Sequence, residues 1–312
     1  MPRSLAMEVL SAIVAASRAR AEAHEDGPDV DREFEVGEFA QLEIRGPFDV
    51  EIETGEPASV RASGPEWALD ALSVEHDGNV LVVACDGDCD GDVNVVITVP
   101  KLRSVRMSGS GDVSIDRIKG DEFDCASSGS GDLSIDEIKA DRVTLSASGS
   151  GDVRVDSVRA KQCEASLMGS GDLLADSIES AAFKLTMHGS GDAHVGECSG
   201  EHFHAVLSGS GDASVDSLES TSVECSLFGS GDIRIDDGNA ETAKLQTSGS
   251  GDIAGEDFEA DDATVSVFGS GDIALCVTQH CDISIMGSGD VTVAGGAECS
   301  VRASGSGEAH CS

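Results

Sequence analysis

The chain of 312 residues has few aromatic and few basic side chains. Aromatic residues make up 3% of it, with one Trp and no Tyr. A core must therefore be built mainly from Val, Ile, Leu, Ala and Cys, which suits a narrow and regularly stacked interior. Only 20 residues are Lys or Arg, against 59 Asp and Glu, and the net charge is −39. This charge excludes nucleic acid and anionic lipid as partners, because both are rich in phosphate.

Long apolar runs are also absent. No stretch reaches the roughly eighteen apolar residues of a membrane-spanning helix, so no transmembrane helix is expected. Residues 1–31 contain a basic Arg3, an apolar run over 5–16 and a small-residue site near 21–23, which are features of an export signal. Glu8 interrupts the run, so the segment is interpreted as a leader outside the fold, either a signal peptide or disordered. The expected location is periplasmic, cell-surface or secreted, with a cytoplasmic protein as the alternative.

One tetrapeptide, in contrast, is abundant. Gly-Ser-Gly begins at residue 109 and returns every twenty residues as far as 269, then after two steps of eighteen at 287 and 305. Ten copies continue with Asp, and the last continues with Glu308. A period of about 20 residues sustained over such a length is typical of a solenoid, in which each repeat packs mainly on its neighbours.

Within each repeat, apolar residues alternate with polar ones. The first repeat has Val113 and Ile115, then Ile118, and later Phe123 and Cys125. Alternation with period two predicts strands with one buried face. Each repeat is thus interpreted as two short strands, joined by the Gly-Ser-Gly turn on one side and by a longer arc on the other. Stacking these units pairs equivalent strands in parallel, about 4.8 Å apart, and predicts an all-β parallel β-helix.

The turn residues are predicted to be structural. Glycine supplies the positive φ of the chain reversal, and Asp is expected to accept hydrogen bonds from the backbone N–H groups or the Ser hydroxyl of its turn. The first four copies of this turn ladder are Gly109, Gly111, Asp112, Gly129, Gly131, Asp132, Gly149, Gly151, Asp152, Gly169, Gly171 and Asp172. The alternative is a column of Ca²⁺ sites, since carboxylates stacked about 4.8 Å apart repel one another.

The ten cysteines follow the repeat register. Four occupy inward-facing columns and are interpreted as small buried hydrophobic residues: Cys125, Cys163, Cys198 and Cys225. Cys281 and Cys299 share a register eighteen residues apart and should be neighbours on adjacent coils. The sequence leaves open whether Cys281 forms a disulfide with Cys299 or with Cys276.

One acidic segment, CDGDCDGDVN at 85–94, matches the first half of a calcium-binding loop. The candidate ligands of a weak Ca²⁺ site are Asp86, Asp88, Asp90 and Asp92. Position twelve of the loop is Ile97 instead of a bidentate Glu, and strands flank it. The alternative is a hairpin turn with solvated carboxylates. No other cofactor is expected.

No catalytic constellation is evident in the sequence. Sugar-cleaving β-helix enzymes combine acids with nearby bases and with aromatic side chains, which are scarce in this chain, and no nucleophile–base pair stands out. Four histidines fall within or beside one coil: His188, His194, His202 and His204. His194 and His204 are expected on different strands and to face outward, so a shared metal is not expected. A non-enzymatic protein is expected.

Three features together resemble the bacterial head GIN domain family, a domain of unknown function described as a putative auto-transporter adhesin. They are the segment QLEIRGPFDVEIETGEPASVRASGPE (41–66), the segment VNVVITVPKLRSVRMSGSGDVSI (93–115) and the train of GSGD turns. The resemblance covers residues 34–312. It implies a single-stranded right-handed parallel β-helix, with Gly-Ser-Gly as the tight turn, that is exported and has no agreed catalytic residues.

The predicted organisation is a leader over 1–31 and a single domain over 32–312. Residues 32–107 form irregular opening coils or a cap, and 108–312 form the regular coils. The expected function is that of an exported adhesion or surface-binding module whose partner is a surface glycan or a protein. The alternatives are an envelope protein that self-assembles through the ends or faces of the solenoid, and a Ca²⁺-dependent or polysaccharide-active β-helix.

Overall fold

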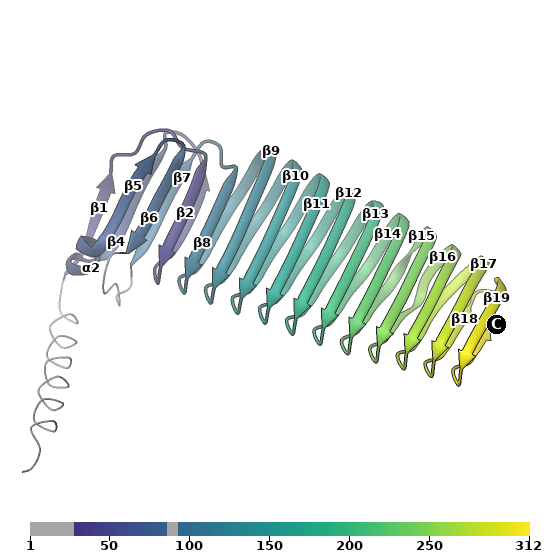
Figure 1. Ribbon diagram of the computed structural model, residues 1–312. Helices are drawn as coiled ribbons and strands as arrows, with labels where there is room; N and C mark the ends of the chain where they lie inside the picture. The colour runs from purple at the N-terminus through teal and green to yellow at the C-terminus, as the bar shows by residue number, and fades with distance from the viewer. Residues whose placement is uncertain (1–27, 86–92) are drawn as a thin grey trace, which may run out of the picture.

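The computed structural model describes residues 28–85 and 93–312. Strands account for 77% of the residues and helix for 2%, and the strands wind into a β-solenoid of about ten turns (Figure 1). The twenty strands of the described residues belong to one continuous sheet. The predicted all-β solenoid is therefore confirmed.

Each regular coil is a single bent strand that forms both walls of the solenoid, where two short strands were predicted. The register is parallel and advances by one repeat per coil, so that Val113 lies beside Leu133 and Leu133 beside Val153. The coils are β9 (Val113–Gly129), β10 (Leu133–Gly149), β11 (Val153–Gly169), β12 (Leu173–Gly189), β13 (Ala193–Gly209), β14 (Ala213–Gly229), β15 (Ile233–Gly249), β16 (Ile253–Gly269) and the shorter β17 (Ile273–Gly287).

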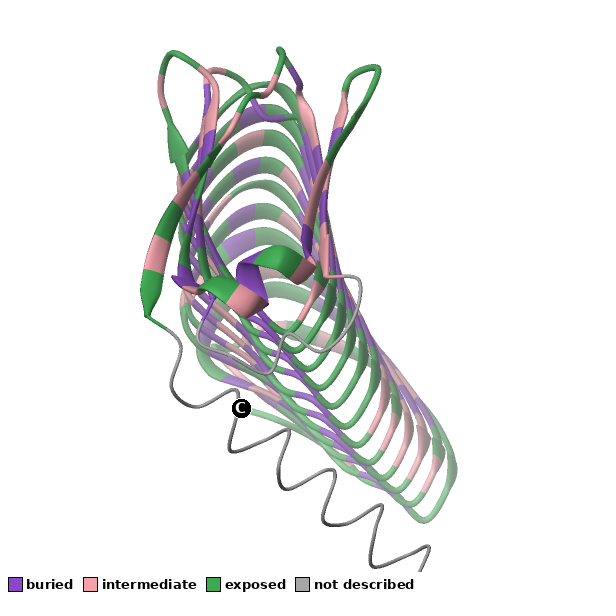
Figure 2. Ribbon diagram, turned by 90° about the vertical axis from the view of Figure 1, so that its left-hand side faces the viewer, coloured by how far each residue is buried: buried purple, intermediate pink, exposed green. Residues whose placement is uncertain are grey.

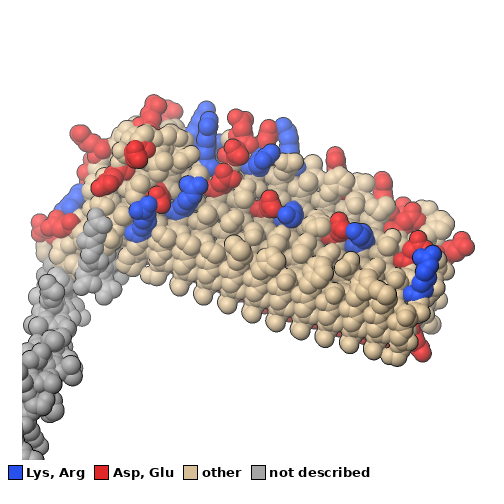
Figure 3. Space-filling view, in the orientation of Figure 1, with Lys and Arg blue, Asp and Glu red and all other residues tan. Residues whose placement is uncertain are grey.

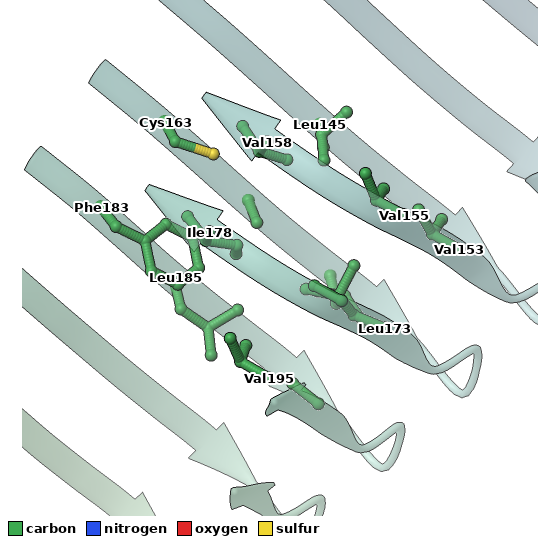
Figure 4. Close-up of a cluster of buried hydrophobic side chains, with 14 of the residues drawn as sticks. Leu145, Val153, Val155, Val158, Cys163, Leu173, Ile178, Phe183, Leu185 and Val195 are labelled. Atoms are coloured by element: carbon green, nitrogen blue, oxygen red, sulfur yellow. The ribbon is translucent and has the colours of Figure 1, made fainter. Parts of the chain in front are cut away.

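The core is a set of stacked apolar columns between the two walls. In the coil shown in Figure 4, Val153, Val155 and Val158 come from one wall and Cys163 from the other, and all four are buried. The next coil repeats the pattern with Phe183, whose ring lies 5.8 Å from that of Phe203 one coil further on. The inward columns predicted from the alternation are confirmed by their burial.

The opening coils are not stacked in chain order. β2 (Gln41–Gly46) and β3 (Asp49–Thr54) form one coil, which pairs on one side with β8 (Ser104–Gly109) and β9. On its other side it pairs with the coil formed by β6 (Val80–Cys85) and β7 (Asn94–Val99). The chain thus builds its second coil first, then the outermost coil, and then crosses back to begin the regular array.

The N-terminal end of the solenoid is covered. β4 (Ser59–Pro65) pairs antiparallel with β7, β1 (Asp29–Phe34) with β4, and β5 (Leu72–Asp77) with β6. The short helix α2 (Glu66–Ala71) joins β4 to β5 and buries Ala68 and Leu69 completely. Figure 2, which views the solenoid from this end, shows the helix lying across the coils. β1 begins inside the segment 1–31 that the sequence assigned to a leader.

The C-terminal end consists of β18 (Val291–Ala294), β19 (Glu298–Gly305) and β20 (Ala309–Cys311). Within the described residues, β19 and β20 have no further strand on their outer side. Val301 continues the inward column of Ile283 and is 47% exposed, because no described strand lies over it.

Cys281 forms a disulfide with neither of its two candidate partners. A disulfide joins Cys299 to Cys311, whose Cα atoms are 6.7 Å apart, and Cys281 and Cys276 are free. Cys281 does lie beside Cys299 in the register, as expected. Cys299 instead bonds across the interior, because β19 is the second wall of one coil and β20 begins the first wall of the next.

The four inward cysteines Cys125, Cys163, Cys198 and Cys225 are free and buried, and burial raises the pKa of each thiol from 9.0 to about 12. We expect them to resist alkylation by iodoacetamide at pH 9, because the thiolate is the reacting form. Because the pKa of each thiol is higher in the folded than in the unfolded chain, protonation of these thiols stabilises the fold. This stabilisation is complete below pH 9 and is lost as the pH rises toward 12.

Peptide mass spectrometry after timed alkylation checks this prediction. The partly exposed Cys276 is the internal control and should be modified first. Unfolding in denaturant should release the four buried thiols together. Modification of Cys125 in the folded protein as fast as that of Cys276 would contradict the burial of this column.

Candidate binding surface

The turn aspartates form a continuous hydrogen-bonded ladder along one edge of the solenoid. The backbone N–H of Asp132 donates to Oδ1 of Asp112 at 2.8 Å, and that of Asp152 donates to Asp132 at 2.8 Å. The series begins at Asp49 and ends at Glu308, whose N–H donates to Asp290. Each carboxylate thus accepts a hydrogen bond from a backbone N–H of the next coil. The sequence had predicted a donor within the same turn. The acceptor bonds offset the repulsion between stacked carboxylates.

The glycines of the turns are required by close backbone contact between coils. At Gly169 φ is +145°, so the chain reversal needs glycine there. At Gly171 φ does not lie in the left-handed region, but a Cβ atom would stand 2.1 Å from the carbonyl oxygen of Gly151. The third residue of the motif is therefore glycine because the coils approach too closely for any side chain.

A shallow acidic groove runs beside this ladder on the wall that begins each coil. One stretch of about 450 Å³ lies along Asp112 and Asp132, and a second of about 510 Å³ lies along Asp172 and Asp192. The two stretches meet at Arg154, which forms ion pairs with Asp156 and Asp176 and lowers the local negative charge. This wall carries much of the chain's negative charge.

The opposite wall differs in character. Two outward columns next to the Gly-Ser-Gly turns contain no Asp, Glu, Lys or Arg over nine coils, and we call them the neutral half-face. They are Ala126, Ser146, Ser166, Thr186, Val206, Ser226, Gln246, Ser266, Ser284 and Ser128, Ser148, Met168, His188, Ser208, Phe228, Ser248, Phe268, Met286. Figure 3 shows this half of the wall almost free of charge. At a rise of about 4.8 Å per coil it is roughly 40 Å long.

Charged residues on the same wall lie further from the turns, where they pair with one another. Lys184 Nζ lies 3.0 Å from Oε1 of Glu164, one coil away. Glu224 accepts from Lys244 at 2.6 Å and lies 3.2 Å from Nδ1 of His204. The hydrogen bond from Lys244 is the main cause that lowers the pKa of the Glu224 carboxyl. From β11 to β15 the charges of this column are paired, so they add little field to the neutral half-face.

Several large apolar side chains stand on the neutral half-face. Met168 is 51% exposed, Phe228 41% and Met286 52%, and Phe268 in the same column is partly exposed. These exposed apolar residues were not predicted from the sequence, because only the inward-facing columns were considered there. The signal was present, since each of these residues directly precedes a Gly-Ser-Gly turn.

The other candidate residues do not form a site. Asp86, Asp88, Asp90 and Asp92 lie outside the described residues, so the predicted Ca²⁺ loop stays a prediction. Among residues 28–85 and 93–312, no three His, Cys, Asp or Glu side chains are arranged to hold a metal ion.

His194 and His204 lie on one bent strand, β13, where different strands were expected, but on its opposite walls. His194 lies on the wall with the acidic groove, beside Ser214. His204 lies on the other wall, with Glu224.

No helix in the described part of the chain is both long and apolar enough to span a membrane.

Residues 38–212 and 195–297 match a protein-family model described as "Putative auto-transporter adhesin, head GIN domain". No curated protein matches the chain significantly. Among solved structures, a putative adhesin from Bacteroides fragilis is 17% identical, with a TM-score of 0.40, over 92% of this chain and 98% of its own. A putative adhesin from Parabacteroides distasonis is 18% identical, with a TM-score of 0.43, over the same shares. Similarities at this level carry no argument about function.

Proposed function

The chain belongs to the head GIN domain family of "putative auto-transporter adhesins", and from this premise we propose that it is an exported, non-enzymatic adhesion module that binds through its neutral half-face. The neutral half-face is then the surface through which the protein adheres. The partner lies outside the cell, and no catalytic group is needed.

The observation that carries the proposal is the absence of charge on a long, flat face of a very acidic protein. With a net charge of −39, most of the surface repels other acidic surfaces, including other proteins and cell envelopes. The neutral half-face lets a partner approach without burying unpaired carboxylates, which is costly. Its serine hydroxyls also offer hydrogen bonds on eight of the nine coils, the exception being β12, where the Thr186 hydroxyl is buried.

Introducing charge on this face should abolish binding. We expect beads coated with the double variant Ser166→Glu/Ser226→Glu to lose most of their attachment to intact bacterial cells and to mucin-coated surfaces. The two glutamates would have to be desolvated against the partner. Attachment is measured by counting beads that remain after washing under flow.

The matched control is Ser114→Glu, an exposed serine on the opposite wall, which should attach like the wild type. Thermal melting confirms that all variants are folded. The proposal fails if wild-type beads do not attach to either surface, or if the double variant attaches as well as the control.

A further inference from the structure

We propose that the neutral half-face binds an extended, uncharged, β-linked glycan chain, with Phe228 and Phe268 as its two stacking platforms. This inference rests on the proposed function and adds the chemical class of the ligand. It is argued from the spacing of the two rings, from the groups beside them and from the charge of the surface.

The two rings stand in one column, two coils apart. Phe228 lies beside Ser248 and Ser248 beside Phe268 in the parallel register, so the Cα atoms are separated by about 9.6 Å along the solenoid axis. This is about the length of two pyranose units in an extended β-linked chain. Every second sugar would then meet a ring, and the sugar between them would lie over the small Ser248.

The neighbouring side chains suit the edges of a sugar. Ser226, Gln246 and Ser266 form the adjacent outward column, are half-buried, and carry hydroxyl or amide groups. Such groups can donate to and accept from sugar hydroxyls. Aromatic rings contribute apolar contact for the C–H face of the sugar. A platform of rings alternating with polar groups is typical of a site that holds an amphipathic ligand in one orientation.

The charge of the protein favours an uncharged glycan over an acidic one. The platform carries no basic residue that could pair with a uronate or a sulfate, and the chain's net charge repels acidic polysaccharides.

A second copy of this protein is a weaker occupant. It would bring a further charge of −39 close to the first. The apolar side chains are also interrupted by serine, whereas the cores of homodimer interfaces are largely apolar.

Affinity electrophoresis and calorimetry with cello-oligosaccharides and a mixed-linkage β-glucan test the inference. We expect the wild type to bind both, and Phe228→Ala/Phe268→Ala to lose ~10-fold or more in affinity, because two ring contacts are removed. Phe228→Leu/Phe268→Leu keeps the apolar character but removes the rings, and should also bind more weakly. Val301→Ala removes an exposed apolar side chain that lies outside the neutral half-face, and should bind like the wild type. Dextran and alginate should bind to none of these proteins.

Three results would overturn the inference: no binding to any uncharged β-linked chain, undiminished binding by the double alanine variant, or concentration-dependent association of the wild type that this variant removes. The last would assign the surface to a second copy. The bead assay separates this inference from the proposed function. If beads carrying Phe228→Ala/Phe268→Ala attach as well as the wild type, adhesion stands and the glycan platform falls. If wild-type beads do not attach, the proposed function itself falls.

Discussion

Gly171→Ala should lower the free energy of unfolding by about 3 kcal/mol or more, although it adds only one methyl group. The added Cβ would lie 2.1 Å from the carbonyl oxygen of Gly151 and 2.9 Å from its carbonyl carbon. Both atoms belong to the backbone of the adjacent coil, so no side-chain rotation can relieve the clash. The two coils must separate at this corner, which lengthens the hydrogen bond from Asp172 to Asp152. Denaturant unfolding followed by circular dichroism measures the loss.

Gly120→Ala is the matched control. Gly120 lies in the bend at the opposite edge, where a Cβ atom would meet nothing closer than 3.8 Å. The next two coils already have Ala140 and Ala160 at this position in the register. The substitution should change the free energy of unfolding by less than about 0.5 kcal/mol. Equal losses in the two variants would show that coil spacing at the turn is not the reason for the glycine.

The regular coils could be predicted almost completely from the sequence. The fixed period set the register, and the alternation separated inward from outward columns, as the burial of Val113, Ile115 and Phe123 confirms. The reason is physical: each coil contacts mainly its two neighbours, so a local pattern repeated along the chain determines the whole array. The single bent strand was not foreseen, because the alternation does not show whether hydrogen bonding continues through the arc.

The two ends could not be predicted in this way. The β2–β3 coil lies between β6–β7 and β8–β9, an order that depends on long-range pairing and leaves no period in the sequence. Cys299 was placed correctly beside Cys281, but register alone does not reveal that the last coil brings Cys311 across the interior.

The candidate surface was only partly visible in the sequence. The turn aspartates were recognised as acceptors, while their donors on the next coil required the structure. The neutral half-face is defined by the absence of charged residues at two outward positions of nine successive coils. A single uncharged outward residue resembles any other surface residue. Phe228 and Phe268 occupy the same position in the period, so their shared column could be predicted from the sequence, whereas their partial exposure required the structure.

Phe183→Ala should lower the free energy of unfolding by about 3–5 kcal/mol, the usual cost of truncating a buried phenylalanine. Phe183 is 2% exposed, and its ring lies 5.8 Å from that of Phe203 at an angle of 53°. Its other neighbour in the column is the smaller Cys163, which cannot fill the space left by the ring. The cavity would weaken the contacts of one coil with both of its neighbours. In a solenoid this allows the array to open locally in its middle.

Phe228→Ala makes the same chemical change at an exposed site and should cost less than about 0.5 kcal/mol. Denaturant unfolding and amide hydrogen exchange distinguish the two variants, since Phe183→Ala should also lose protection in β11, β12 and β13. A similar loss of stability in both variants would mean that Phe228 supports the fold. Its ring would then not be free to act as an exposed binding platform. If Phe228→Ala is as stable as the wild type, any loss of glycan binding at this residue can be assigned to the contact itself, because the coil that presents it is intact.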